Sequence, residues 1–214
     1  MSSPVTRAPR ADAERNRRRV VDAASLVFAE HGSAATLNDV ARAAGVGVGT
    51  VYRKFADKDA VLDALFDQKI DALVDLAEHT LTLSDPGAAI RDLLLGVMTK
   101  RASDRGLDAI LSAQSRSSRF AEELGRRFIP VVDQLVDRAI AAGELRPDFS
   151  GQEVCLLGFM VGKVADITRD TNPAVWRRYA QLLIDGTRLQ PGIPPLAPEP
   201  LSFRENAEAL GRAN

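Results

Sequence analysis

The residues that decide the fold are Thr36–Phe55, which read TLNDVARAAGVGVGTVYRKF. The segment after Thr36 carries apolar side chains at the spacing of one helix face, at Leu37, Val40, Ala41 and Ala44. Thr36 is expected to cap this short helix, with Asp39 in the place of the usual glutamate of a capping box. Gly45 is expected to end it, and the turn Gly45–Gly47 then allows a second short helix to cross the first steeply.

The second helix has an apolar stripe and a short, polar, basic face. The stripe consists of Val48, Val51, Tyr52 and Phe55, and the opposite face of Gly49, Thr50, Arg53 and Lys54. A preceding helix with apolar residues spaced from Val20 to Phe28 supplies a third element. Together the three segments predict a helix-turn-helix.

This segment, with the following Asp57-Lys58-Asp59 and Val61-Leu62, resembles the TetR family of bacterial transcriptional regulators. The resemblance is specific over residues 14–66 and only architectural beyond them. Gly47 departs from the pattern, because the family usually has Ser or Thr as the cap of the recognition helix. The resemblance implies an N-terminal DNA-binding domain, followed by a helical domain that dimerises through its last two helices and holds a small-molecule pocket.

The resemblance also implies which residues contact DNA. The expected phosphate anchors are Thr36, Gly49, Tyr52 and Lys58, and the residues expected to face the major groove are Val48, Thr50, Arg53 and Lys54. Three of these have a second interpretation: Tyr52 and Val48 as packing residues, and Lys58 as a solvated charge. The small residues at the start of the helix suit entry into a groove about 12 Å wide.

Charge divides the chain of 214 residues unequally. The net charge is −1, but residues 1–58 hold 10 basic and 6 acidic residues and residues 59–214 hold 18 and 23, so the two parts carry +4 and −5. This distribution excludes a uniformly basic coat and predicts a basic DNA-reading head on an acidic body. An architectural, non-specific DNA-binding protein without a ligand is the alternative, and it is disfavoured because such proteins neutralise many phosphates.

Catalytic and metal-binding patterns are not found in the sequence. His31 and His79 lie outside metal-ligand spacings, and Cys155 lies in an apolar segment, so we expect no enzyme activity, no metal and no cofactor. The first twenty residues lack the apolar core of a secretory signal. The apolar stretch Val154–Val161 is far short of the roughly 20 residues of a spanning helix. We therefore expect a cytoplasmic protein with no membrane association.

The whole chain is predicted to be all-α, with about nine helices. Residues 1–13 are expected to be a flexible basic arm, residues 14–58 the DNA-binding domain, residues 59–190 the ligand-binding and dimerisation domain, and residues 191–214 a Pro-rich tail. Asp85-Pro86 and Asn172-Pro173 are each expected to begin a helix. Pro130 is expected to kink or split a helix over residues 118–142.

The last two helices, around residues 152–168 and 173–188, are the predicted homodimer contact. Gly158 and Gly162 are four residues apart on the first of them, which allows close approach of another helix, either the partner's or one within the chain. The candidate pocket residues, which are otherwise plain core, are Leu94, Met98, Ile110, Gln114, Phe120, Phe128, Phe159 and Lys163.

The functional hypothesis combines these predictions. The chain is expected to be a ligand-responsive transcriptional repressor that binds an inverted-repeat operator in double-stranded DNA as a homodimer and is released by a small-molecule effector. If Lys163 lines the pocket, an anionic or carbonyl-bearing effector is expected. In the other interpretation, Lys163 is a surface residue.

Overall fold

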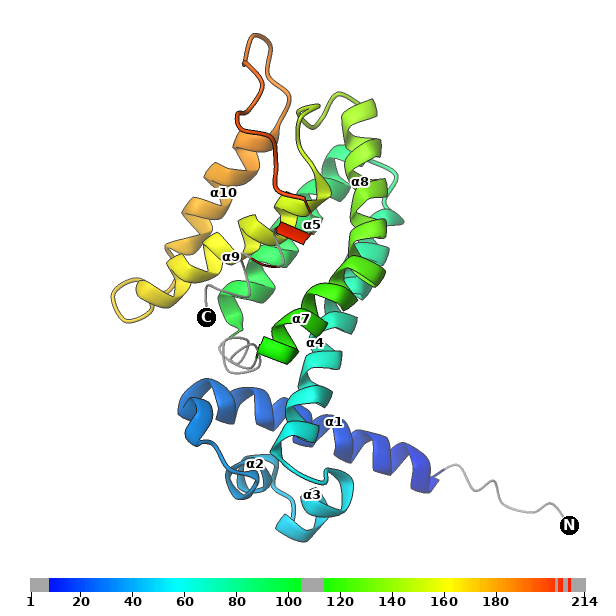
Figure 1. Cartoon of the computed structure of the whole chain (residues 1–214), viewed down its shortest axis with the longest axis vertical. Helices are drawn as coiled ribbons and strands as arrows, with labels where there is room; N and C mark the ends of the chain where they lie inside the picture. Colours follow the sequence, from blue (N-terminus) through cyan, green and yellow to red (C-terminus); the bar gives the residue numbers. More distant parts are fainter. Residues whose placement is uncertain (1–7, 105–113, 203, 206–207, 209–214) are drawn as a thin grey trace, which may run out of the picture. The chain divides into compact units, whose positions relative to one another are not determined.

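The computed structural model describes residues 8–104, 114–202, 204–205 and 208, with the backbone alone given for residues 8–14, 33 and 114–118. Its helices, shown in Figure 1, follow in chain order. They are α1 (Ala8–His31), α2 (Leu37–Ala44), α3 (Val48–Lys54), α4 (Lys58–Leu81), α5 (Pro86–Ser103), α7 (Gln114–Glu123), α8 (Ile129–Ala141), α9 (Gly151–Ile167) and α10 (Trp176–Thr187).

The helices belong to two compact units whose border lies within α4. The first unit extends to Gln68, and the second begins at Lys69, ten residues or so beyond the predicted domain border at residues 58 and 59. Apart from helices and turns, the described residues form one isolated antiparallel bridge, between Leu145 and Arg188. The all-α prediction is therefore confirmed. None of the helices in the described part is long and apolar enough to cross a membrane.

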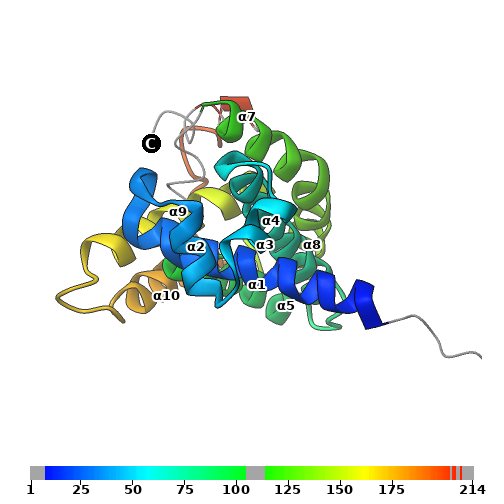
Figure 2. The same ribbon diagram turned by 90° about the horizontal axis from the view of Figure 1, so that it is seen from below.

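The first unit is built from α1, α2 and α3 with the first part of α4 (Figure 2). The predicted apolar face of α1 is buried, with Val20, Ala24 and Phe28 at most 1% exposed. The predicted face of α2 is buried as well, and Gly45 ends that helix with a left-handed φ of 64°. Local capping and the helical spacing of apolar residues thus suffice to predict this unit.

The start of α1 corrects the prediction that all of residues 1–13 form a flexible arm. The helix begins at Ala8, so that residues 8–13 of the expected flexible arm are helical. The reason is that Pro9 lies in the first turn, where a backbone N–H has no acceptor within the helix and proline is tolerated.

The second unit depends on a close approach between α5 and α9. A Cβ atom on Gly162 would lie 2.5 Å from Cγ of Arg101, and one on Gly158 would lie 2.9 Å from Cγ1 of Val97. Both glycines therefore face α5 of the same chain. The alternative in which they pack against an internal helix is confirmed, and their use as a contact with a partner chain was wrong.

Two other predicted helix boundaries have different outcomes. Pro130 does divide its segment: a π-helical turn, Leu124–Phe128, separates α7 from α8, and Pro130 occupies the first turn of α8. Asn172-Pro173, in contrast, does not begin a helix. Asn172 instead accepts a hydrogen bond from the N–H of Ala174 at 3.3 Å within a turn, and α10 begins only at Trp176.

The chain after α10 is held to the loop between α8 and α9. Arg146 donates two hydrogen bonds to the Asp148 carboxylate, at 2.5 and 2.9 Å, and one to the carbonyl of Pro194 at 3.1 Å. The N–H of Leu196 donates to the same carboxylate at 2.5 Å. These contacts, the Arg146 bonds first, lower the pKa of Asp148 to about 2. We call this group of contacts the tail clamp.

We predict that Gly162→Ala destabilises the protein by about 1–3 kcal/mol, because the added methyl group overpacks the α5–α9 contact. Thermal or urea unfolding measures the change. Gly186→Ala is the control, since Gly186 lies in α10 with no atom within 4 Å of its added Cβ. There alanine should have no cost, because it is the better helix former. Equal stability of Gly162→Ala and the unsubstituted protein would contradict the prediction.

Candidate nucleic-acid interface

The outward side of α3 presents most of the predicted DNA-binding residues to solvent. Val48 is 41% exposed and Tyr52 is 53% exposed, so their interpretation as packing residues of the apolar stripe was wrong. Val51 and Phe55 carry the packing instead, at 0% and 3% exposure. The exposed set is completed by Gly47, Gly49 and Arg53, with Thr50 and Lys54 partly exposed.

Caps on both sides of α2 fix the geometry of this surface. The Thr36 hydroxyl accepts a hydrogen bond from the N–H of Asp39 at 3.2 Å, and both the hydroxyl and the N–H of Thr36 donate to the Asp39 carboxylate, at 2.6 and 3.0 Å. The predicted capping box is confirmed. These bonds, that of the Thr36 side chain first, hold the pKa of Asp39 below its usual value. Because the Thr36 hydroxyl proton is already donated to Asp39, it is not available to a phosphate while the box is intact.

The N-terminus of α3 has a glycine where a side-chain cap would normally lie. Gly47 is the N-cap, in extended conformation, and no side-chain hydrogen bond closes this end. The first amides of the helix lie beside exposed glycines, Gly47 and Gly49, that add no bulk. Such an N-terminus attracts anions, because its amides lack acceptors within the helix. The backbone of α3 can thus approach a phosphate closely.

Basic side chains of the first unit form contacts that the sequence analysis did not anticipate. The Nζ atom of Lys58 lies 5.3 Å from the ring centroid of Phe28, and the guanidinium of Arg17 lies 5.7 Å from that of Phe55. Arg19 donates a hydrogen bond to the carbonyl of Ala44 at 2.9 Å. No spacing rule in the sequence indicates these partners, because each lies far along the chain from its basic residue.

The predicted pocket residues divide into a buried and a partly exposed group. Leu94, Met98 and Phe128 are at most 1% exposed, whereas Phe120, Phe159 and Lys163 are partly exposed. Ile110 and the side chain of Gln114 lie outside the described residues. Of these candidates, the structure shows Phe159 and Lys163 in contact with each other.

An aromatic ring between two cations distinguishes the inner side of α9. The ring centroid of Phe159 lies 5.3 Å from Nζ of Lys163 and 5.9 Å from Cζ of Arg101. Arg101 is only 8% exposed, and its guanidinium lies 3.8 Å from the Asp166 carboxylate. Sequence reasoning missed Arg101, although it continues the helical spacing of Leu94 and Val97 on α5. That periodicity was the available signal.

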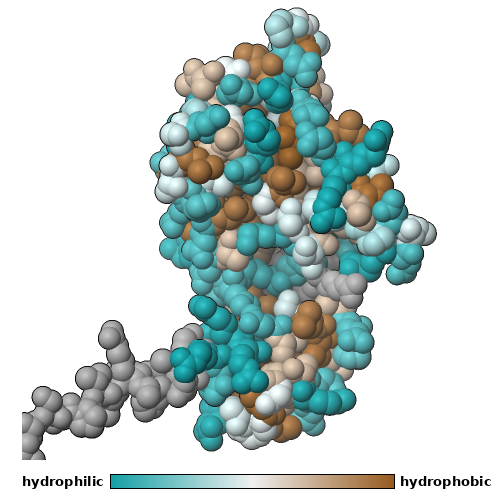
Figure 3. Space-filling model, turned by 180° about the vertical axis from the view of Figure 1, so that it is seen from behind, coloured by the Kyte–Doolittle hydropathy of each residue, from teal (hydrophilic) through white to brown (hydrophobic). Residues whose placement is uncertain are grey.

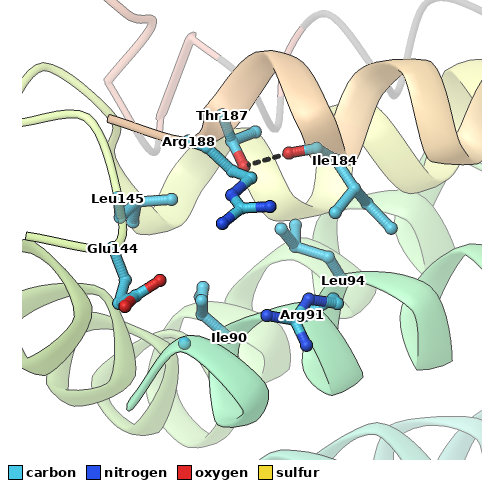
Figure 4. A pocket seen from close by; sticks show the side chains of 9 residues that line it. Ile90, Arg91, Leu94, Glu144, Leu145, Ile184, Thr187 and Arg188 are labelled. Carbon is cyan, nitrogen blue, oxygen red and sulfur yellow. Dashed lines mark hydrogen bonds between the residues drawn. The ribbon is translucent and has the colours of Figure 1, made fainter. Parts of the chain in front are cut away.

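A small pocket opens elsewhere in the second unit, between the first turns of α5 and the end of α10 (Figure 4). Ile90, Leu94 and Ile184 form its apolar part, and Arg91 and Arg188 lie at its polar side. Thr187 donates its hydroxyl hydrogen to the carbonyl of Ile184 at 2.8 Å. Of the predicted pocket residues, only Leu94 lines this one.

Apolar side chains remain exposed on α9 and α10. Met160 and Ile167 on α9 are 50% and 81% exposed, and Tyr179 and Leu182 on α10 are 44% and 57% exposed. We call these four residues the outer face. On the side of the protein shown in Figure 3, apolar residues are instead scattered among hydrophilic ones. Grouped apolar exposure is a property of contact surfaces.

Other reactive groups offer little chemistry. Desolvation raises the pKa of the Cys155 thiol to about 12, so the thiol stays protonated at neutral pH and is a poor nucleophile. Among the residues that the structure describes, no group of three or more His, Cys, Asp or Glu side chains is placed to hold a metal ion.

Sequence comparisons find relatives of both units. The profile of the bacterial regulatory proteins of the tetR family matches residues 20–65, and that of the C-terminal domain of SbtR-like transcriptional regulators matches residues 85–189. The HTH-type transcriptional repressor LfrR of Mycolicibacterium smegmatis is 32% identical over 136 residues, which cover 64% of this chain and 69% of the relative.

Solved structures share the fold. A TetR transcription regulatory protein from Mycobacterium vanbaalenii is 27% identical, with a TM-score of 0.62 over 84% of this chain and 98% of the other. The transcriptional regulator FadR from Bacillus subtilis, solved in complex with stearoyl-CoA, is 20% identical, with a TM-score of 0.60 over 79% of this chain and 98% of the other.

Proposed function

The chain belongs to the tetR family of bacterial regulatory proteins, and on that premise we propose that it represses transcription by binding an inverted-repeat operator as a homodimer, until a small-molecule effector releases it. It would act in the cytoplasm, where the DNA lies. The reading head would comprise residues 14–58, and residues 59–190 would sense the effector and dimerise. The observation that carries the proposal is the outward surface of α3.

That surface has the composition of a base-reading element. Val48 and Tyr52 would be costly to leave in water, and a valine can pack against the methyl group of thymine in the major groove. Arg53 is exposed one turn later and is long enough for a bidentate contact to guanine. Thr50 and Lys54 complete the proposed reading surface.

The proposed phosphate anchors surround this surface. Gly49 lets the backbone of α3 approach a phosphate, the Tyr52 hydroxyl can donate to one, and Lys58 supplies a positive charge at the start of α4. Thr36, whose hydroxyl proton is donated within the capping box, contributes by holding the start of α2 in place.

We predict that Arg53→Ala weakens binding to the operator by about 1–3 kcal/mol and relaxes selectivity at one base position. Binding of both proteins to a duplex selected from random DNA, and to its single-base variants, measures this. A loss that is equal for all sequences would make Arg53 a phosphate contact. A specific regulator prefers its operator over random DNA by at least about 10³-fold. If the unsubstituted protein binds the two nearly equally, the proposed regulatory function is overturned.

The outer face of α9 and α10 is the proposed dimer contact. Met160 and Ile167 are seven residues apart and lie on one side of α9, and Tyr179 and Leu182 share a side of α10. Two copies related by a twofold axis would bury this face in a four-helix arrangement. The two α3 helices would then bind half-sites about one DNA turn apart, and the operator sequence would be an inverted repeat.

We predict that Leu182→Glu converts the dimer to a monomer at micromolar concentration, because the twofold axis places two unpaired carboxylates in the contact. Sedimentation measures the change, and operator binding should weaken with it. Leu95→Glu is the matched control, since Leu95 is 43% exposed on α5, outside the outer face. Dimers of unchanged strength in Leu182→Glu would refute the proposed contact.

The effector site is proposed to lie in the second unit, beside the ring of Phe159. Lys163 and Arg101 place two positive charges against this ring. The apolar candidates of the sequence analysis, Leu94, Met98, Phe120 and Phe128, are kept in the proposal as its apolar part. Ile110 and Gln114 remain part of the proposal. The charge favours an effector with an anionic group and an apolar part. The effector shifts the equilibrium between the DNA-bound and the released conformation only as far as its affinities for the two conformations differ.

We predict that stearoyl-CoA, the compound in the FadR structure, releases the selected duplex, and that Lys163→Met raises the concentration needed about tenfold. A hydrogen bond to a charged group has this magnitude. Lys100→Met, at an exposed position on α5, is the control. If Lys163→Met is released from DNA at the same stearoyl-CoA concentration as the unsubstituted protein, Lys163 is excluded from the effector site. If stearoyl-CoA does not release the unsubstituted protein, this acyl-CoA is excluded as the effector.

A further inference from the structure

We propose that Arg19, assisted by Arg17, positions the recognition helix α3 from within the protein, and that this internal contact, not a phosphate contact, is what Arg19 contributes to DNA binding. The proposal rests on the proposed DNA-binding function. It assigns separate roles to arginines that the sequence places together in one basic run, Arg17–Arg19.

Arg19 closes the exit of α2. Its Nη2 atom donates to the carbonyl of Ala44, the last residue of α2, at 2.9 Å, and the bond is partly buried. A carbonyl in the last turn of a helix receives no hydrogen bond from an N–H of that helix. A cation beside this end is also stabilised by the helix dipole. This bond thus supplies the partner that the end of α2 lacks.

The same guanidinium covers the turn between α2 and α3. A Cβ atom on Gly45 would lie 3.5 Å from Nη2 of Arg19, which is an ordinary van der Waals contact. Gly45 has the left-handed conformation that redirects the chain toward α3. From α1, Arg19 therefore contacts both the end of α2 and the turn, and it fixes the place where α3 begins.

Arg17 acts at the opposite end of α3. Its guanidinium lies 5.7 Å from the ring centroid of Phe55, within the range of a cation–π contact. Phe55 is the residue that ends α3, and it is buried. Because residues two apart on a helix do not face the same direction, α1 reaches the entry and the exit of α3 with different side chains.

Arg18, between the two, provides a matched comparison. It is exposed, and within the described part of the chain no hydrogen bond, ion pair or ring contact involves its side chain. Removing Arg18 takes the same charge from the same turn of α1 without touching the α2–α3 turn. The difference between substitutions at positions 18 and 19 therefore reports the contact with Ala44.

The experiment compares the unsubstituted protein with Arg19→Met, Arg19→Lys and Arg18→Met. The affinity of each protein is measured for a duplex that the unsubstituted protein selects from random DNA and for random DNA itself. Both affinities are measured over a range of salt concentrations. The temperature is one at which unfolding curves show all four proteins to be folded. Amide hydrogen exchange of residues 45–50 is measured in the free proteins. If Arg19→Met does not fold, Arg19→Gln replaces it.

We expect Arg19→Met to bind the selected duplex about tenfold more weakly than Arg18→Met, with a smaller preference over random DNA and the same salt dependence. Exchange at residues 45–50 should be faster in the free Arg19→Met protein. Arg19→Lys keeps the positive charge and a donating ammonium group, so it should recover part of both losses.

Two results would overturn the inference. The first is that Arg19→Met and Arg18→Met bind DNA equally and exchange their amide hydrogens equally. The second is that their exchange is equal but the plot of log affinity against log salt concentration is shallower by about 0.9 for Arg19→Met, which is the signature of one lost phosphate contact. If the unsubstituted protein selects no sequence, the proposed function fails instead, and the exchange comparison still tests the role of Arg19.

Discussion

The left-handed backbone of Gly45 is the constraint on which the DNA-reading end of the protein depends. An L-residue with a side chain is strained at a φ of 64°, whereas glycine adopts it readily. This conformation ends α2 and sends the chain into α3 after two further residues. The exposure of Val48 and Tyr52 follows from it, since Val51 and Phe55 then face inward and leave these two on the outside. The second unit has a comparable constraint in Gly162, against which Arg101 packs.

Local chemistry was the part of the structure that the sequence could predict. The capping box of Thr36 and Asp39, the glycine end of α2, and the Asp85 cap of α5 each depend on a few neighbouring residues, and all are present. Failures occurred where local patterns are ambiguous. Pro9 was read as part of a flexible arm, although the first turn of a helix accepts proline, and Asn172 was read as a cap although the same residue also closes turns.

Tertiary partners were the part that the sequence could not predict. The spacing of Gly158 and Gly162 indicated close packing but did not identify α5 as the neighbour. The apolar stripe of α3 did not show which of its residues face inward. This helix is only seven residues long, which gives too few turns to define a face. The ring of Phe159 between Lys163 and Arg101 combines two helices distant in sequence, and only the Phe159–Lys163 half follows from helical spacing.

The tail clamp has a consequence for how the second unit can open. It joins Arg146 and Asp148 to Pro194 and Leu196, positions 48 residues apart, and the segment between them contains α9 and α10. A helix near the end of a chain normally frays from its free terminus at little cost. Here the last turn of α10 is followed by an anchored segment, so fraying from that side must first break the bonds to Asp148. Opening of α10 is thereby coupled to opening of the α8–α9 loop, and the two should exchange their amide hydrogens as one cooperative unit.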